Sequence, residues 1–187
     1  EPVLGVLASD LTAFATLTHE PGTPFPPGVA YPPEYLEAIQ KGPSNIRVTF
    51  DEESNPVLHS PGDINFVVPG HRDIDFRTEV LDRAGVTKQV LTFTAPGTME
   101  EELKRAADLA RKVNDALAKI KEERSDRYTA LATLPLHDPA ASVKEFERVT
   151  GELGFRGVVL SDAMEMRGVA APTELEAATD GALRAGV

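Results

Sequence analysis

The chain has 187 residues, a formal net charge of −11 and no cysteine. The negative charge argues against nucleic acid or an anionic membrane as a partner, and the lack of cysteine excludes disulfides and thiolate metal sites. No apolar run approaches the roughly 20 residues of a membrane span. Without a basic leader or an initial methionine, we expect a cytoplasmic protein and a fragment or processed chain.

The first 72 residues contain few regular patterns. Residues 19–33 form a Pro-rich arm, because proline removes backbone donors and restricts the residue before it. A short helix is predicted over 34–40, after Pro33 and before Gly42. Between 44 and 72 we expect an irregular β excursion, with strands over 46–50 and 64–68 and a polar, turn-rich segment between them.

From residue 74 onward helices and strands alternate. A first helix ends at Gly85, and a strand covers 88–94. The next helix opens with a capping box, in which Thr98 is followed three residues later by Glu101. Apolar residues at helical spacing mark the inner faces of the two helices: Phe76, Val80, Leu81 and Ala84 in the first, and Leu103, Ala106, Ala107, Ala110, Val113, Leu117 and Ile120 in the second.

Two further pairs of strand and helix follow. A strand spans 128–134, and Asp138 caps a helix that has Pro139 at its first position. A buried strand covers 155–160, and a second capping box, Thr173 with Glu176, opens a final helix to about residue 185. The inner face of the helix after Asp138 is predicted to hold Val143, Phe146, Val149 and Leu153.

This alternation predicts an α/β fold class with parallel strands, because strand–helix–strand crossovers of this length run right-handed within one sheet. A complete (β/α)8 TIM-type barrel needs roughly 250 residues. The last helix ends at Val187 with no strand after it. We therefore expect a single, partial barrel domain over 1–187, with the Pro-rich arm and the β excursion attached. Open sheet edges in such a barrel favour a homo-oligomer.

Asp162 is the candidate catalytic residue. It follows the predicted strand over 155–160, and parallel α/β folds build their chemistry at the carboxyl ends of strands. The alternative interpretation is that Ser161 and Asp162 cap the next helix or its loop. The four histidines, His19, His59, His71 and His137, lack the spacing of known zinc sites. We therefore assign them surface or hydrogen-bonded roles and name no metal ligand.

Several motifs between residues 31 and 157 point to one family. They are Tyr31-Pro32-Pro33-Glu34-Tyr35, the runs over 81–91 and 128–136, Asp138-Pro139, and Leu153-Gly154-Phe155-Arg156-Gly157. This stretch resembles the amidohydrolase superfamily, in the branch of aminocarboxymuconate-semialdehyde decarboxylase. The resemblance implies a (β/α)8 barrel with a divalent metal, often zinc, and a metal-dependent hydrolase or decarboxylase of a small carboxylate-bearing substrate.

The ligands that the amidohydrolase resemblance implies do not carry over to this sequence. The superfamily's His-x-His motif should precede Tyr31, where this sequence has Gly28-Val29-Ala30. Its later ligands would belong to strands beyond Val187. The resemblance therefore implies a site whose activity is impaired in this chain.

Residues 154–187 carry a second set of motifs. Gly154-Phe155-Arg156-Gly157-Val158-Val159 leads through Ser161-Asp162 to Met164, and the segment ends Arg184-Ala185-Gly186-Val187. It resembles the family 3 glycoside hydrolases of the β-N-acetylhexosaminidase type. The resemblance places Asp162 on the nucleophile of a glycosidase, a carboxylate that attacks the anomeric carbon. Pro69-Gly70-His71 echoes that family's acid/base loop, although Asp75-Phe76-Arg77 replaces its second histidine.

The two resemblances describe a mosaic, and three functions stay open. The first is the amidohydrolase-type enzyme, which we take as the prediction because its motifs cover most of the chain. The second is a glycosidase with Asp162 as nucleophile. The third is a barrel fragment without catalytic activity.

Overall fold

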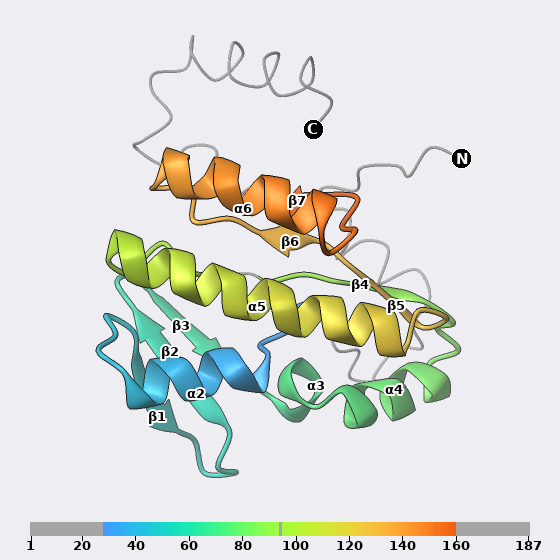
Figure 1. Cartoon of the computed structure of the whole chain (residues 1–187). Helices are drawn as coiled ribbons and strands as arrows, with labels where there is room; N and C mark the ends of the chain where they lie inside the picture. The colour runs from blue at the N-terminus through green and yellow to red at the C-terminus, as the bar shows by residue number, and fades with distance from the viewer. Residues whose placement is uncertain (1–27, 94, 160–187) are drawn as a thin grey trace, which may run out of the picture.

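The computed structural model describes residues 28–93 and 95–159, and its centre is a set of short parallel strands (Figure 1). Strand β4 (Gln89–Leu91) pairs in parallel with β5 (Tyr128–Ala130), and β6 (Ala132–Thr133) pairs in parallel with β7 (Val158–Val159). Only Leu131 separates β5 from β6. The extended run over 128–133 therefore pairs with β4 before Leu131 and with β7 after it.

A further parallel segment lies on the other side of β4. Val29 forms a parallel bridge with Thr92, whose N–H donates to the carbonyl of Gly28 at 2.8 Å. A side chain at position 28 would not fit, because a Cβ there would lie 2.6 Å from the carbonyl oxygen of Val90. Glycine therefore allows this segment to approach β4. The parallel segments follow one another in space in the order of the chain.

Three helices alternate with the parallel strands. They are α4 (Ile74–Arg83) before β4, α5 (Leu103–Glu123) between β4 and β5, and α6 (Pro139–Gly151) between β6 and β7. In Figure 1, α5 crosses the middle of the view and α6 lies beside it, and α5 contacts β5, β6 and α6. Parallel strands joined through helices are the repeating unit of a (β/α)8 barrel. The predicted α/β class is confirmed for this part of the chain.

A small antiparallel sheet lies between the first parallel segment and β4 in the sequence. After helix α2 (Pro33–Lys41) come β1 (Arg47–Phe50), β2 (Pro56–Ser60) and β3 (Asp63–Phe66), followed by the short helix α3 (Pro69–Arg72). The strands lie in the order β1-β2-β3, and each adjacent pair is antiparallel. Strand β2 occupies the segment that we predicted as polar turns, and its buried Val57 and Leu58 explain why it is a strand.

Of three helix boundaries predicted from the sequence, two are confirmed and one is wrong. The helix predicted over 34–40 is confirmed as α2, and Asp138 caps α6 by accepting a hydrogen bond from the N–H of Ala141 at 3.0 Å. The capping box of Thr98 and Glu101 is wrong. Helix α5 begins at Leu103 after Glu102, with no side-chain cap. The Glu101 carboxylate instead accepts hydrogen bonds from the Ser44 hydroxyl and the Asn45 N–H.

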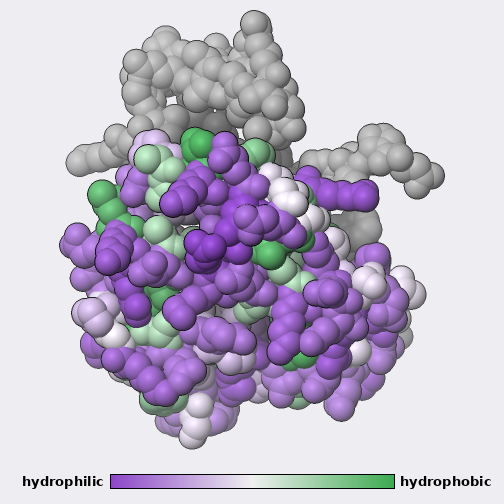
Figure 2. Space-filling view, in the orientation of Figure 1, coloured by the Kyte–Doolittle hydropathy of each residue, from purple (hydrophilic) through white to green (hydrophobic). Residues whose placement is uncertain are grey.

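The hydrophobic core lies between α5 and the parallel strands and continues under α2, α4 and β2. The predicted inner face of α5 is confirmed at Ala106, Ala110, Val113 and Leu117, whereas Leu103 is half-exposed. The face shown in Figure 2 is mainly hydrophilic, as expected from the net charge of the chain. The largest fully buried apolar side chains are Leu58, Val67, Leu81, Leu91, Leu109, Val113, Leu117 and Val149.

The predicted inner face of α6 is partly wrong. Val149 is buried, but Val143 is 61% exposed and Phe146 is 39% exposed, whereas Glu145 is only 7% exposed. The helix is rotated because Glu145 accepts hydrogen bonds from Asn114 and from Arg148. A buried carboxylate needs such partners to offset its lost hydration. The polar network, and not the apolar spacing, sets the orientation of α6.

Asn114 of α5 is the centre of this network. Its side-chain oxygen accepts the N–H of Thr133 at 2.8 Å, and its Nδ2 donates to the carbonyl of Thr133 at 2.9 Å and to Glu145 at 2.8 Å. The amide thus bonds both backbone groups of one β6 residue, as a neighbouring strand would. Arg148 joins Glu145 to Asp115, which completes the link between α5, β6 and α6.

We predict that Asn114→Ala destabilises the protein by about 2–4 kcal/mol, because it leaves the buried backbone groups of Thr133 without partners. Urea unfolding followed by circular dichroism measures this difference. Gln40→Ala is the matched control, since it removes an exposed amide from α2, and we expect it to change stability by less than about 0.5 kcal/mol. Equal effects of the two substitutions would contradict the role given to Asn114.

Candidate active site at the carboxyl ends of the parallel strands

An aromatic cluster lies where the first two parallel segments end. It comprises Tyr31, Tyr35, His71 and Phe93, and we call it the strand-end cluster. Tyr31 follows the bridge at Val29, Tyr35 lies in the first turn of α2, and Phe93 follows β4. The rings of Tyr35 and Phe93 meet edge to face with centroids 4.7 Å apart, and Phe93 and His71 each lie 5.9 Å from Tyr31.

Two hydroxyl groups connect the strand-end cluster to the loop after β4. The Tyr35 hydroxyl donates to the carbonyl of Gly97 at 2.9 Å, and the Tyr31 hydroxyl donates to the carbonyl of Ala95. Burial raises the pKa of both phenols well above the usual value, and neighbouring negative charge adds to the effect. Both tyrosines are therefore neutral donors that hold this loop in place.

His71 of α3 is held in one tautomer. Its Nδ1 lies 3.2 Å from the carbonyl oxygen of Phe66, which can only accept a hydrogen bond. Nδ1 therefore carries the proton, and the buried Nε2 has a lone pair with no hydrogen-bond partner among the described residues. Burial, followed by the positive charge of Arg77, lowers the pKa of this imidazole.

His137 shows the same arrangement after the end of β6. Its Nε2 lies 3.0 Å from the carbonyl oxygen of Glu101, so that nitrogen carries the proton. The Nδ1 atom is buried, again without a partner within the described part of the chain. Glu101 itself is 5% exposed and contributes negative charge near Tyr35. Each of these two imidazoles thus presents one lone pair that can accept a hydrogen bond.

The described residues do not fit a metal ion. Metal sites in proteins need at least three side-chain ligands for zinc, or several oxygen ligands for harder cations. Within residues 28–93 and 95–159, no three His, Asp or Glu side chains lie together in a group that could hold a metal ion. No reaction step that depends on a metal follows from this part of the chain.

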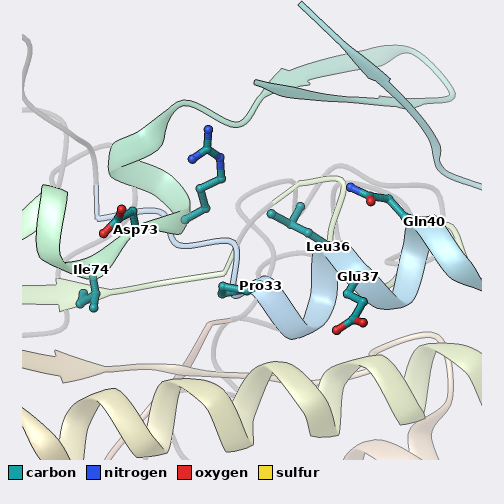
Figure 3. A pocket seen from close by; sticks show the side chains of 7 residues that line it. Pro33, Leu36, Glu37, Gln40, Asp73 and Ile74 are labelled. Atoms are coloured by element: carbon teal, nitrogen blue, oxygen red, sulfur yellow. The ribbon is translucent and has the colours of Figure 1, made fainter. Parts of the chain in front are cut away.

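The surface hollow of about 550 Å³ in Figure 3 lies between α2 and the junction of α3 with α4 and is open to solvent. Its charged side chains are already engaged: Glu37 pairs with Lys41, Arg72 donates to Asn55, and Asp73 caps α4. This hollow therefore does not resemble a substrate site, which would offer converging polar groups. Its lining residues are Pro33, Leu36, Glu37, Gln40, Arg72, Asp73 and Ile74.

The site residues that the sequence predicted lie in different parts of the chain. Asp162, His19 and the second capping box lie outside the described residues. His59 belongs to the antiparallel sheet, where its Nε2 lies 2.7 Å from the Thr49 hydroxyl. The segment that echoed an acid/base loop forms helix α3. Sequence reasoning missed the site role of Tyr31 and Tyr35, although their Tyr-Pro-Pro-Glu-Tyr motif was visible.

Parallel strands joined by helices, with chemistry-bearing side chains at the carboxyl ends, define the class of β/α-barrel enzymes. Within that class, the family model described as amidohydrolase matches residues 24–176. The chain belongs to the amidohydrolase family. The match continues through much of the segment over 154–187, and none of the comparisons supports a family 3 glycoside hydrolase there.

The chain is similar to several decarboxylases. It is 36% identical over 88 residues to gamma-resorcylate decarboxylase from Rhizobium radiobacter, which is 46% of this chain and 27% of the relative. It is 33% identical over 97 residues to 6-methylsalicylic acid decarboxylase from Penicillium expansum, which is 51% and 29% of the two chains. The matched part thus spans less than a third of the length of these relatives.

Solved structures support the fold. A dihydroxybenzoic acid decarboxylase from Polaromonas sp. JS666, with bound manganese and an inhibitor, aligns with a TM-score of 0.51 at 26% identity, over 70% of this chain and 36% of that one. The apo form of an IDCase from Metarhizium anisopliae aligns with a TM-score of 0.59 at 19% identity, over 70% and 40%, and this likeness shows the fold alone. Within the described residues, no helix combines the length and apolarity needed to cross a membrane.

We predict that His71 makes stability depend on pH. Because the folded state lowers its pKa, the unfolded chain takes up the proton first as the pH falls through about 6.5. The stability contributed by neutral His71 is therefore complete above that pH and is lost below it. Urea unfolding of the wild type and of His71→Gln between about pH 5 and about pH 7 should show their stability difference shrinking as the pH falls. A constant difference would contradict the prediction.

Proposed function

We propose that this chain is part of an enzyme that decarboxylates a small aromatic carboxylic acid. The observation that carries the proposal is membership of the amidohydrolase family combined with similarity to decarboxylases of dihydroxybenzoate and methylsalicylate type. In such a reaction the carboxylate leaves as carbon dioxide, and a proton takes its place on the ring carbon. We further propose a cytoplasmic location, as predicted from the sequence.

The strand-end cluster supports the site from beneath and does not line it. Tyr31, Tyr35 and Phe93 are 2%, 0% and 2% exposed and form a fixed layer at the carboxyl ends of the first parallel segments. Rings buried to this degree have no free face for a substrate, and Nε2 of His71 and Nδ1 of His137 are buried as well. The layer therefore fixes the backbone at these strand ends, and the proposal of an aromatic substrate rests on the similar decarboxylases.

We propose that a divalent metal ion, manganese in preference to zinc, serves the complete site. The similar decarboxylase from Polaromonas contains bound manganese. Such an ion would polarise the substrate carboxylate or hydroxyl group. Since the described residues do not fit a metal ion, its ligands are proposed to come from outside residues 28–93 and 95–159.

Asp162 stays our proposed catalytic carboxylate. It follows β7 by three positions in the sequence, and β7 runs parallel to β6, whose carboxyl end leads toward His137. A carboxylate after the fourth parallel strand suits either proton transfer or the binding of a cation. The glycosidase role first considered for this residue has no support from the comparisons.

The substrate class can be tested with the 187-residue chain purified in the presence of manganese. Because the sequence predicts impaired activity in this chain, we expect slow conversion of 2,6-dihydroxybenzoate to 1,3-dihydroxybenzene with release of carbon dioxide, and we expect a chelator to stop the reaction. A nitrophenyl N-acetylglucosaminide should not be hydrolysed. Failure to release carbon dioxide from a protein shown to bind manganese would contradict the decarboxylase proposal, and hydrolysis of the glycoside would replace it.

For Asp162 we expect the substitution Asp162→Asn to lower kcat/KM for the decarboxylation by roughly 100-fold, the usual order for loss of an acid/base group. Asp126→Asn is the matched control, because this exposed carboxylate lies before β5, at the opposite ends of the strands. If both variants retain full activity while binding manganese normally, Asp162 has no catalytic role.

A further inference from the structure

The antiparallel sheet has two outer edges, β1 and β3, and its hydrogen bonds show which backbone groups point away from the sheet. The N–H of Asp51 donates to Asn55 at 3.0 Å, and the N–H of Val67 donates to the carbonyl of Pro56 at 2.8 Å. Because backbone groups alternate along an antiparallel pair, both bonds indicate that Thr49 faces β2. Val48 and Phe50 of β1 therefore direct their N–H and C=O groups away from the sheet.

The edge formed by β3 is partly closed. By the same alternation, Ile64 and Phe66 direct their backbone groups outward on this side. The N–H of Ile64 donates to the Asp63 carboxylate at 2.8 Å, and the carbonyl of Phe66 accepts from His71. Side chains of the protein itself thus occupy this edge, which is one way in which proteins protect a sheet from further pairing.

The edge formed by β1 has no such protection. Among the described residues, none bonds the outward backbone groups of Val48 or Phe50. The four residues of β1 include neither proline nor lysine, which commonly block edge pairing. Beside the strand lies an open hollow of about 400 Å³, and Phe50 is 60% exposed at its rim. The hollow is lined by Ile39, Gln40, Ile46, Val48 and Phe50.

Charge is distributed unequally along β1. The exposed Arg47 begins the strand, and the acidic turn of Asp51, Glu52 and Glu53 follows its end. An antiparallel neighbour with the same sequence would bring the basic end of each strand to the acidic end of the other. A parallel neighbour would bring like charges together. The charge pattern therefore favours an antiparallel second copy of this chain.

We propose that two copies of the protein associate through their β1 strands and form one continuous six-stranded antiparallel sheet. The outward residues pair with one another, so Val48 of each copy lies opposite Phe50 of the other, with four backbone hydrogen bonds in total. The two Thr49 residues meet on the two-fold axis. Arg47 then lies directly opposite Asp51 of the second copy, and each Phe50 ring lies against Val48 at the hollow of the other copy.

This register uses every residue of β1. A shift by one position would face inward backbone groups against outward ones and lose the hydrogen bonds. A shift by two in one direction would place Arg47 opposite Thr49, and in the other direction it would pair Val48 with Glu52, which lies in the turn beyond the strand. The strand alone is short, so we expect an association in the range of about 10 µM to about 1 mM, weaker than that of permanent dimers.

Sedimentation velocity of the full chain over this concentration range, at about 0.15 M salt, tests the proposal. We expect a monomer–dimer equilibrium that Arg47→Glu weakens about tenfold, because two symmetry-related attractions become repulsions. Arg83→Glu is the control for net charge, since it makes the same change at the exposed end of α4 and should leave the equilibrium constant unaltered. A monomer at all concentrations would overturn the proposal.

A second pair of variants distinguishes the two edges of the sheet. Phe50→Lys introduces a charge at the open edge, and Phe66→Lys makes the same change at the closed edge, where the side chain is similarly exposed at 56%. Only the first should weaken the dimer. Hydrogen exchange provides a direct readout, because the amides of Val48 and Phe50 should become protected as the concentration rises. A dimer without that protection, or one weakened equally by both variants, would show that another surface is used.

Discussion

The structure depends on how one extended run, residues 128–133, exchanges neighbours at Leu131. Before this residue the run pairs with β4, and after it with β7. At Thr133 the backbone groups directed away from β7 have no neighbouring strand among the described residues, and the Asn114 side chain bonds both of them. Buried backbone groups without partners are costly, so the change of neighbours is stable only with this amide in place. Glu145 and Arg148 then fix α6 to the same point.

The candidate site combines rigidity with electrical neutrality. Its tyrosines are neutral at any physiological pH, because burial raises their pKa, and burial keeps His71 largely uncharged as well. Hydrogen bonds from Tyr31 and Tyr35 hold the loop after β4 at two successive places. A neutral, ordered environment of this kind strengthens any charge interaction that a bound carboxylate makes with an ion or a donor.

Local signals in the sequence predicted much of the fold, since Asp138 before Pro139, the break after Lys41 and the apolar spacing of α5 each act within a few residues. The predicted inner face of α6 failed because Glu145 is bonded in the interior by Asn114, 31 positions away in the chain, which apolar spacing cannot reveal. Glu101 left the expected capping box for the same reason, as it bonds Ser44 and Asn45. At the site, the Tyr-Pro-Pro-Glu-Tyr motif indicated a family but not the roles of its rings, which depend on contact with Phe93.

The bond between His71 and the last strand of the small sheet has a consequence for proton movement. Because the Phe66 carbonyl occupies Nδ1, this ring cannot pass a proton from one nitrogen to the other, as a relay histidine does. Any proton must enter and leave through Nε2 alone. The hydrogen bond to the β3 backbone therefore leaves His71 able to accept a proton at Nε2, but not to relay one across its ring.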